Sequence, residues 1–186
     1  MSSVDINILN LIIYFSLKII IFIPILIVHN LFANFTFNAL LSLMTLNIIW
    51  ASMYGTAQGV AYQLKEKAEA KGANVNICEM DDFEISNLGN IEYLAVISST
   101  TGSGDVPVNG ENFWSDLQNV SSEYPNLNFA VCALGDITYE NFCGAGNAIK
   151  EKLLQLNAKE IINICELDGG DDGAEEWCDS LLKKIY

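Results

Sequence analysis

The sequence contains no arginine and only one histidine, His29, among its 186 residues. Any phosphate group that the protein binds must therefore be held without a guanidinium fork. His29 lies in an apolar N-terminal segment, outside the part of the chain that is predicted to fold as a domain. The absence of another histidine excludes a Ser-His-Asp triad and a histidine-based metal site from that domain.

Basic residues are scarce: the chain has 9 bases against 23 acids and a net charge of −14. Such a balance excludes nucleic acid as a partner, because neutralising phosphates requires lysine and arginine. It favours electrostatic attraction to a basic protein surface, although the charge could equally serve only to keep the domain soluble.

The cysteines form no C-x-x-C pair and have no metal-ligand spacing. Cys132 and Cys165 fall inside apolar runs and are interpreted as small core residues. Cys143 differs, because it ends a polar loop. An odd number of scattered cysteines is typical of a reducing compartment. The five are Cys78, Cys132, Cys143, Cys165 and Cys178.

Residues 1–45 are apolar and contain only Asp5 and Lys18 as charged residues. Within them, residues 6–28 are long enough to span a bilayer. Three interpretations stay open: a membrane anchor for a cytoplasmic domain, a signal peptide, or sequence upstream of a true start at Met44. A signal peptide is disfavoured, because the apolar run is long and has no basic start. The expected location is the cytoplasm, with or without anchoring.

Residues 46–186 alternate between strand and helix patterns. This alternation predicts an α/β domain with a parallel sheet of five strands in the order 2-1-3-4-5, covered by helices on both faces. The expected strands are 46–51, 74–78, 93–98, 127–133 and 160–167, and the expected helices are 58–71, 111–120, 142–156 and 174–185.

Three polar loops follow the first, third and fourth predicted strands, at 52–58, 99–105 and 134–142. Since the carboxyl ends of parallel strands meet at one edge of the sheet, these loops should converge on one ligand-binding crevice. The first loop precedes a helix, whose free N–H groups and dipole favour an anion. It has neither a G-x-x-x-x-G-K-[ST] nor a G-x-G-x-x-G motif, which favours a phosphate monoester over a triphosphate or dinucleotide.

The second and third loops suit a flat ring. Gly102 and Gly104 leave room for a ring against the backbone, and the Gly102 peptide could flip to present either C=O or N–H to a ring nitrogen. Tyr139 is the candidate stacking partner, with Phe142 packed below it. Taken singly, each loop could also be an ordinary helix cap, a glycine turn or a half-buried aromatic.

Two segments carry a family resemblance. Residues 97–109 (ISSTTGSGDVPVN) and 133–143 (ALGDITYENFC) resemble the MioC-type short flavodoxins and the flavin mononucleotide (FMN) domains of sulfite reductase and cytochrome P-450 reductase. The resemblance covers about residues 46–186. It implies a flavodoxin-like three-layer sandwich that binds FMN and no metal.

The resemblance also implies a set of site residues. The phosphate would lie against the first loop and the isoalloxazine ring between the other two loops. An acidic residue after the last strand would lie near the flavin; Asp171 matches it best and Asp168 second best. The implied residues are Ser52, Met53, Tyr54, Gly55, Thr56 and Ala57 for the phosphate; Ser99, Thr100, Thr101, Gly102, Ser103 and Gly104 on one side of the ring; Leu134, Gly135, Asp136, Tyr139, Phe142 and Cys143 on the other; and Asp171 as the acid.

The chain departs from the reductase pattern at two places. Thr101 stands where an aromatic is usual, and Met53-Tyr54 replaces a Gln-Thr pair. The expected function is a single-electron carrier rather than a stand-alone enzyme. A separate NADPH-dependent flavin reductase would be the donor, and an enzyme with a basic surface would be the recipient. The alternatives are a flavin-dependent reductase of a quinone or small molecule, and a flavodoxin-shaped binding domain without flavin.

Overall fold

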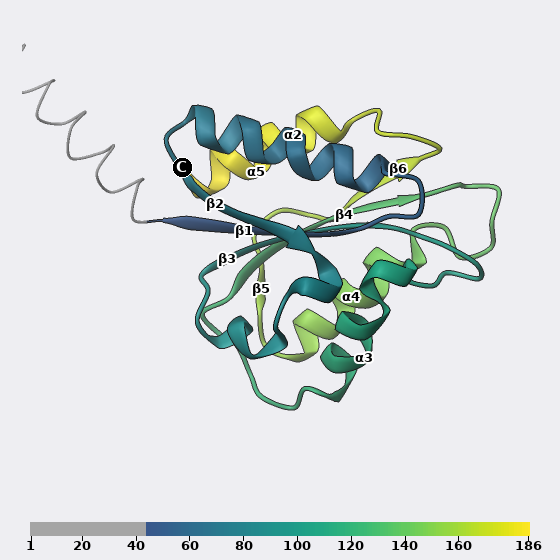
Figure 1. Cartoon of the computed structure of the whole chain (residues 1–186), viewed down its shortest axis with the longest axis horizontal. Coiled ribbons are helices and arrows are strands. Elements are labelled where there is room, and N and C mark those ends of the chain that lie inside the picture. Colours follow the sequence, from purple (N-terminus) through teal and green to yellow (C-terminus); the bar gives the residue numbers. More distant parts are fainter. Residues whose placement is uncertain (1–43) are drawn as a thin grey trace, which may run out of the picture. The chain divides into compact units, whose positions relative to one another are not determined.

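The computed structural model describes residues 44–186, which form a parallel sheet between two layers of helices (Figure 1). The predictions for residues 1–43, including the apolar run 6–28, lie outside the described residues. Within residues 44–186, no helix has the length and apolarity needed to cross a membrane.

The sheet has the predicted strand order. β2 pairs with β1, β1 with β3, and β3 with β4, while β5 and β6 both pair with β4, and every pairing is parallel. The predicted 2-1-3-4-5 order is therefore confirmed. The strands are β1 (Thr45–Ala51), β2 (Asn74–Glu79), β3 (Tyr93–Ser99), β4 (Asn128–Gly135), β5 (Lys159–Glu160) and β6 (Cys165–Asp168).

The central strands are apolar throughout because both of their faces are buried. Successive side chains of a strand point to opposite faces. In β1, Ile48 and Trp50 pack into one core cluster, while Ile49 and Ala51 pack into the other. β3 and β4 repeat this division, so the sheet separates two hydrophobic cores.

Helices α2 (Thr56–Ala70) and α5 (Ala174–Ile185) cover one face of the sheet, and α3 (Glu111–Asn119) and α4 (Gly144–Gln155) cover the other (Figure 1). Short 3₁₀ helices complete the second face: η1 (Met80–Asp82), η2 (Ile85–Gly89) and η3 (Val108–Gly110). The sequence patterns did not predict these 3₁₀ helices. They lie in the β2–β3 connection and ahead of α3.

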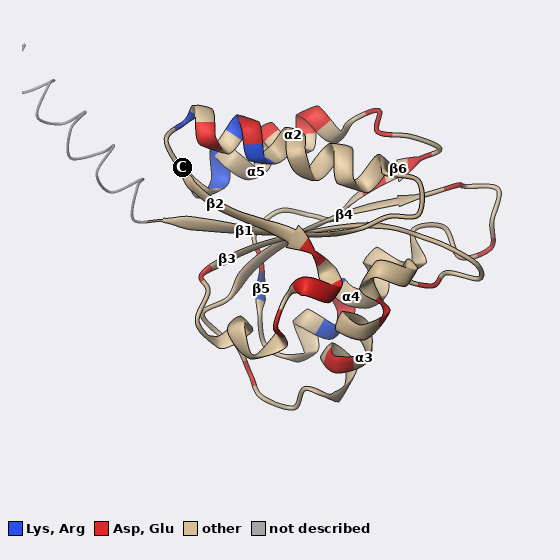
Figure 2. Cartoon of the chain, viewed as in Figure 1, with Lys and Arg blue, Asp and Glu red and all other residues tan. Residues whose placement is uncertain are grey.

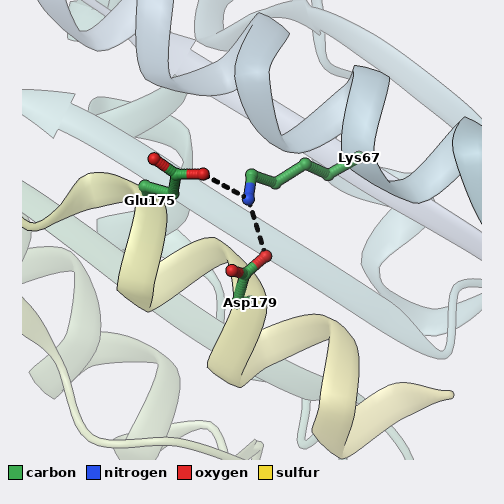
Figure 3. Close-up of polar contacts among 3 residues, drawn as sticks. All are labelled: Lys67, Glu175 and Asp179. Carbon is green, nitrogen blue, oxygen red and sulfur yellow. Dashed lines mark hydrogen bonds and ion pairs between the residues drawn. The ribbon is translucent and has the colours of Figure 1, made fainter.

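Lys67 joins α2 to α5 at the surface (Figure 3). Its Nζ lies 2.7 Å from Oδ1 of Asp179 and 3.0 Å from Oε1 of Glu175. Hydrogen bonds to Asp179 and Glu175 stabilise the charged amine and raise the pKa of Lys67. Because the group is exposed, this network contributes modestly to stability.

The fifth predicted strand is broken into β5 and β6, and residues 161–164 between them belong to neither strand. Ile161 and Ile162 are consecutive, yet both pack against the same core cluster. A regular strand would send them to opposite faces, so the strand must bend there. The side chain of Glu160 accepts a hydrogen bond from the backbone N–H of Ile164 at 2.9 Å, which replaces a lost sheet partner.

Candidate functional site

The loops after β1, β3 and β4 meet at the carboxyl edge of the sheet and enclose a cavity of about 790 Å³. Residues from all three loops line it, together with two glycines that follow β6. The lining residues are Met53, Tyr54, Thr56, Ser99, Thr100, Thr101, Gly102, Ser103, Gly104, Leu134, Gly135, Asp136, Tyr139, Glu140, Asn141, Gly169 and Gly170. Most of the residues chosen from the sequence are therefore brought together.

The first loop turns sharply into α2. Gly55 precedes the helix with a φ of +87°, a left-handed conformation that glycine adopts without strain. The hydroxyl of Ser52 accepts a hydrogen bond from the Gly55 N–H at 3.0 Å, and the Ser52 N–H donates to Oδ1 of Asn109 at 3.0 Å. These contacts hold the loop so that the first turn of α2 opens toward the cavity. Free N–H groups at that turn could hold an anion without a cation.

The side chains of the first loop divide into cavity-lining and buried ones. Thr56 lines the cavity, and Tyr54 stands at its mouth with 95 % of its surface exposed. Met53 is half exposed beside it. Ala57, by contrast, is fully buried in the core under α2, so only its backbone N–H faces the helix end.

The second loop is a tight turn closed by backbone hydrogen bonds between Thr101 and Asp105. Gly102 has a φ of +52° and Gly104 a φ of +109°. A Cβ on Gly104 would lie 2.8 Å from the Cβ of Asn141, and Asn141 in turn donates from Nδ2 to the carbonyl of Ser103. Glycine is needed at position 104 because the second and third loops touch there.

Thr100 supplies a polar atom without a partner at the cavity wall. Its Oγ1 is buried and makes no hydrogen bond to any described residue. Buried hydroxyls in folded proteins are almost always paired. A bound group with a polar edge would satisfy this one.

The third loop is held by its own acidic residues. Oδ1 of Asp136 accepts hydrogen bonds from the hydroxyl and the backbone N–H of Thr138. These bonds lower the pKa of Asp136, so its carboxylate stays ionised. Asp168, at the end of β6, accepts a hydrogen bond from the Ile137 N–H at 2.9 Å. Tyr139 is left 65 % exposed at the cavity wall, where its ring is available for stacking.

Six of the chosen residues do not line the cavity: Ser52, Gly55 and Ala57 of the first loop, described above, and Phe142, Cys143 and Asp171. Phe142 is half-buried beneath the third loop, close to Gly135. Cys143 is fully buried at the start of α4, where its thiol lies 3.3 Å from the carbonyl of Ala133. Burial raises its pKa to about 12, which disfavours the reactive thiolate. Asp171 is exposed, one residue beyond the lining glycine Gly170.

Several lining residues were not selected from the sequence. Glu140 and Asn141 belong to the third loop but were not chosen as contacts. Gly169 and Gly170 were missed altogether, although a Gly-Gly pair directly after a strand is a turn signal that could have indicated them. The Gly169 N–H donates to the carbonyl of Gly135 at 2.8 Å, which places this turn beside the third loop.

Acidic residues dominate this edge of the molecule. Figure 2 shows Asp and Glu on the loops that follow β4 and β6, whereas the lysines lie on the helices, directly after α2 and on β5. No lysine is among the cavity-lining residues of the described chain. The acids at or next to the cavity are Asp105, Asp136, Glu140, Asp168, Asp171 and Asp172.

Comparison with known proteins agrees with this geometry. The flavodoxin family profile matches residues 48–180. The flavoprotein alpha-component of sulfite reductase from Vibrio vulnificus is 35% identical over 143 residues, and that from Bacillus subtilis is 33% identical over 141 residues. These matches cover 75% and 74% of this chain but 23% of each relative, so the chain spans about a quarter of those proteins.

Solved structures that resemble this chain are also flavodoxins. A cysteine-to-alanine mutant of flavodoxin from Pseudomonas aeruginosa superposes with a TM-score of 0.68 and 25% identity, covering 76% of this chain and 99% of that one. A Streptococcus flavodoxin superposes with a TM-score of 0.67 at 20% identity, covering 76% of this chain and 97% of its own, which supports the fold. The chain belongs to the flavodoxin family, a family of FMN-binding electron-transfer flavoproteins.

Proposed function

We propose that this protein binds FMN in the cavity at the carboxyl edge of the sheet and carries single electrons between partner proteins. The observation that supports this most strongly is the convergence of three loops, from β1, β3 and β4, on one cavity of about 790 Å³. The donor set fits FMN in three respects: a helix N-terminus for the phosphate, a glycine turn for the ring, and the unpaired hydroxyl of Thr100 for a polar edge.

The first loop would hold the phosphate. The backbone N–H groups of Thr56 and Ala57 and the hydroxyl of Thr56 would donate to its oxygens, and the dipole of α2 would stabilise its charge. The first turn of α2 contains no acidic residue, so nothing there repels an anion. This arrangement replaces the guanidinium that the chain lacks.

The second and third loops would hold the ring. Tyr139 would stack on one face, while the backbone from Ser99 to Gly104 would run along the opposite side. The Gly102 peptide would present its C=O or N–H to a ring nitrogen according to whether that nitrogen carries a proton. Thr101 is turned toward its own loop, with Oγ1 3.3 Å from the carbonyl of Asp105, and would leave that face of the ring less covered than an aromatic would.

When bound, FMN supplies the one- and two-electron redox chemistry, for which the protein provides position and electrostatics. The carboxylates around the cavity would disfavour added negative charge on the ring, and so would lower the potential at which it accepts electrons. Asp136 would keep this influence over a wide pH range, because its hydrogen bonds to Thr138 keep it ionised.

Exposed apolar side chains border the cavity within this acidic surface. Met53, Tyr54, Ile137 and Tyr139 are each at least half exposed. A redox partner with a basic surface would be attracted by the acids and would then contact these side chains in a brief encounter. An NADPH-dependent flavin reductase would act as donor, and an electron-accepting enzyme as recipient. The five free thiols are consistent with a protein that acts in the reducing cytoplasm.

Reduction and delivery can be tested separately with the FMN-loaded full chain. We expect NADPH alone to leave it oxidised, NADPH with a flavoprotein reductase to reduce it, and the reduced protein to pass electrons to cytochrome c, a basic one-electron acceptor. Delivery should slow as salt is added. Steady turnover of a quinone by the protein itself would instead favour the reductase alternative.

The acidic edge can be tested with paired variants. Asp171→Asn with Asp172→Asn should slow delivery to cytochrome c several-fold and weaken its salt dependence. The matched control, Glu92→Gln with Glu123→Gln, removes the same charge ahead of β3 and β4, at the opposite edge of the sheet, and should have little effect. Equal effects of both pairs would show that only net charge matters.

A further inference from the structure

Cysteines gather in the part of the core beneath α5. Cys132 on β4 and Cys178 on α5 are fully buried in one core cluster, and Cys165 on β6 packs against the same cluster. None of the three lines the cavity, so the proposed electron transfer does not use them. All described cysteines are free thiols.

Cys132 and Cys165, hereafter the thiol pair, lie directly opposite each other on neighbouring parallel strands. Both side chains point to the same face of the sheet, because residues in register share a face. Neighbouring strands are about 4.8 Å apart. That spacing falls within the range of about 4.4–6.8 Å between Cα atoms that a disulfide requires.

The two thiols already interact and differ in their access to solvent. The neighbouring Cys132 thiol favours the thiolate of Cys165 and lowers its pKa, whereas Cys165 and burial raise the pKa of Cys132. Cys165 is half-buried and Cys132 is fully buried. Cys165 is therefore the thiol that an oxidant reaches first, with Cys132 in place to react with the product.

We infer that Cys132 and Cys165 are an oxidation site that closes to a reversible disulfide when the protein meets a hydroperoxide. The Cys165 thiolate attacks one peroxide oxygen, the O–O bond breaks, hydroxide leaves, and a sulfenic acid forms. The Cys132 sulfur then attacks that sulfur, the S–O bond breaks, and the oxygen leaves with the thiol proton as water. In sum, two thiols and one hydrogen peroxide give one disulfide and two waters, and the peroxide gains the two electrons that the sulfurs lose.

The bond would form just below the cavity wall. Further along the same two strands, Gly135 lies opposite Asp168. At this point the Gly169 N–H donates a hydrogen bond to the carbonyl of Gly135. The carboxylate of Asp168 accepts another from the Ile137 N–H. A disulfide between β4 and β6 would lock together the strands that position the third loop and the Gly169–Gly170 turn. Exposed disulfides are reduced more readily than buried ones, and Cys165 is only half-buried, which makes this one reversible.

The test treats the purified full chain with hydrogen peroxide, counts free thiols, and maps cross-linked peptides by mass spectrometry. We expect the free thiols to fall from five to three, with a Cys132–Cys165 peptide as the product and full recovery on adding dithiothreitol. Cys165→Ser and, separately, Cys132→Ala should each abolish the cross-link. The control variant Cys78→Ser removes another half-buried thiol, on β2, and should leave it unchanged.

Three results would overturn the inference: a cross-link that joins Cys178 or Cys143 instead, a dimer linked between chains, or over-oxidation of Cys165 without any cross-link. The assay needs no FMN, so its outcome is independent of whether the protein binds a flavin. Far-UV circular dichroism of each variant shows that a missing cross-link does not come from unfolding.

Discussion

The backbone N–H of Ser52 donates a hydrogen bond to Oδ1 of Asn109 at 3.0 Å, which ties the loop after β1 to the segment that follows the loop after β3. Nδ2 of the same asparagine donates to Glu79 at the end of β2, at 3.2 Å. One side chain therefore fixes the first loop relative to two neighbouring strands. The proposed phosphate end of the cavity depends on this contact.

Asn109→Ala should weaken FMN binding by about 5-fold, the equivalent of one lost hydrogen bond of about 1 kcal/mol. The first loop would lose its anchor while the cavity-lining side chains stay the same. Fluorescence titration with FMN measures the change. Asn112→Ala, which removes an asparagine bonded to Asp81 on the surface, is the control and should bind FMN as the wild type does. Equal affinity of both variants would show that the Asn109 contact does not matter for binding.

Tyr139→Ala should weaken FMN binding by about 3- to 10-fold and restore part of the flavin fluorescence, because stacking contributes about 0.5–1.5 kcal/mol. Tyr139→Phe keeps the ring and should behave like the wild type. Tyr62→Ala removes another exposed tyrosine, on α2 and away from the cavity, and should change neither quantity. If Tyr139→Ala retains full quenching and affinity, Tyr139 is not the stacking residue.

Gly102→Ala should lower the free energy of unfolding by about 1–2 kcal/mol, since its φ of +52° strains any residue with a Cβ. Gly59→Ala is the counterpart on a helix. Gly59 lies in α2, and a Cβ there meets no atom within 4 Å, so this variant should be more stable by about 0.5–1 kcal/mol. Urea denaturation measures both. Loss of stability in both variants, or in neither, would contradict the backbone argument.

Lys67→Met should lower Tm slightly, and the difference from the wild type should shrink in high salt. The hydrogen bonds to Asp179 and Glu175 raise the pKa of Lys67 above its ordinary value of 10.5. A raised pKa adds stability that is fully present below pH 10.5 and is lost as pH rises through the higher folded-state pKa. Thermal melts from pH 8 upward should therefore show the two proteins converging above about pH 10.5. A gap that persists there would point to packing of the lysine stem.

The fold could be predicted because both faces of β1, β3 and β4 are buried, which makes them short apolar runs between helical patterns. Most of the lining residues could be predicted because they lie directly after those strands. The break at residues 161–164 could not be predicted, because it depends on Ile161 and Ile162 both packing against the same core cluster. The role of Asn109 arises from contacts between distant segments, on which local sequence carries no information. The Gly169–Gly170 turn has a local signal in its Gly-Gly pair, but its place beside the third loop depends on the distant contact with Gly135.

FMN titration of the purified full chain, followed by flavin fluorescence and visible absorption, tests the central claim most directly. The account predicts strong quenching of the fluorescence, shifted visible bands and saturation at one FMN per chain, with riboflavin binding much more weakly because it lacks the phosphate. A folded chain that leaves both signals of FMN unchanged would contradict the account and would favour a flavodoxin-shaped domain that works without flavin.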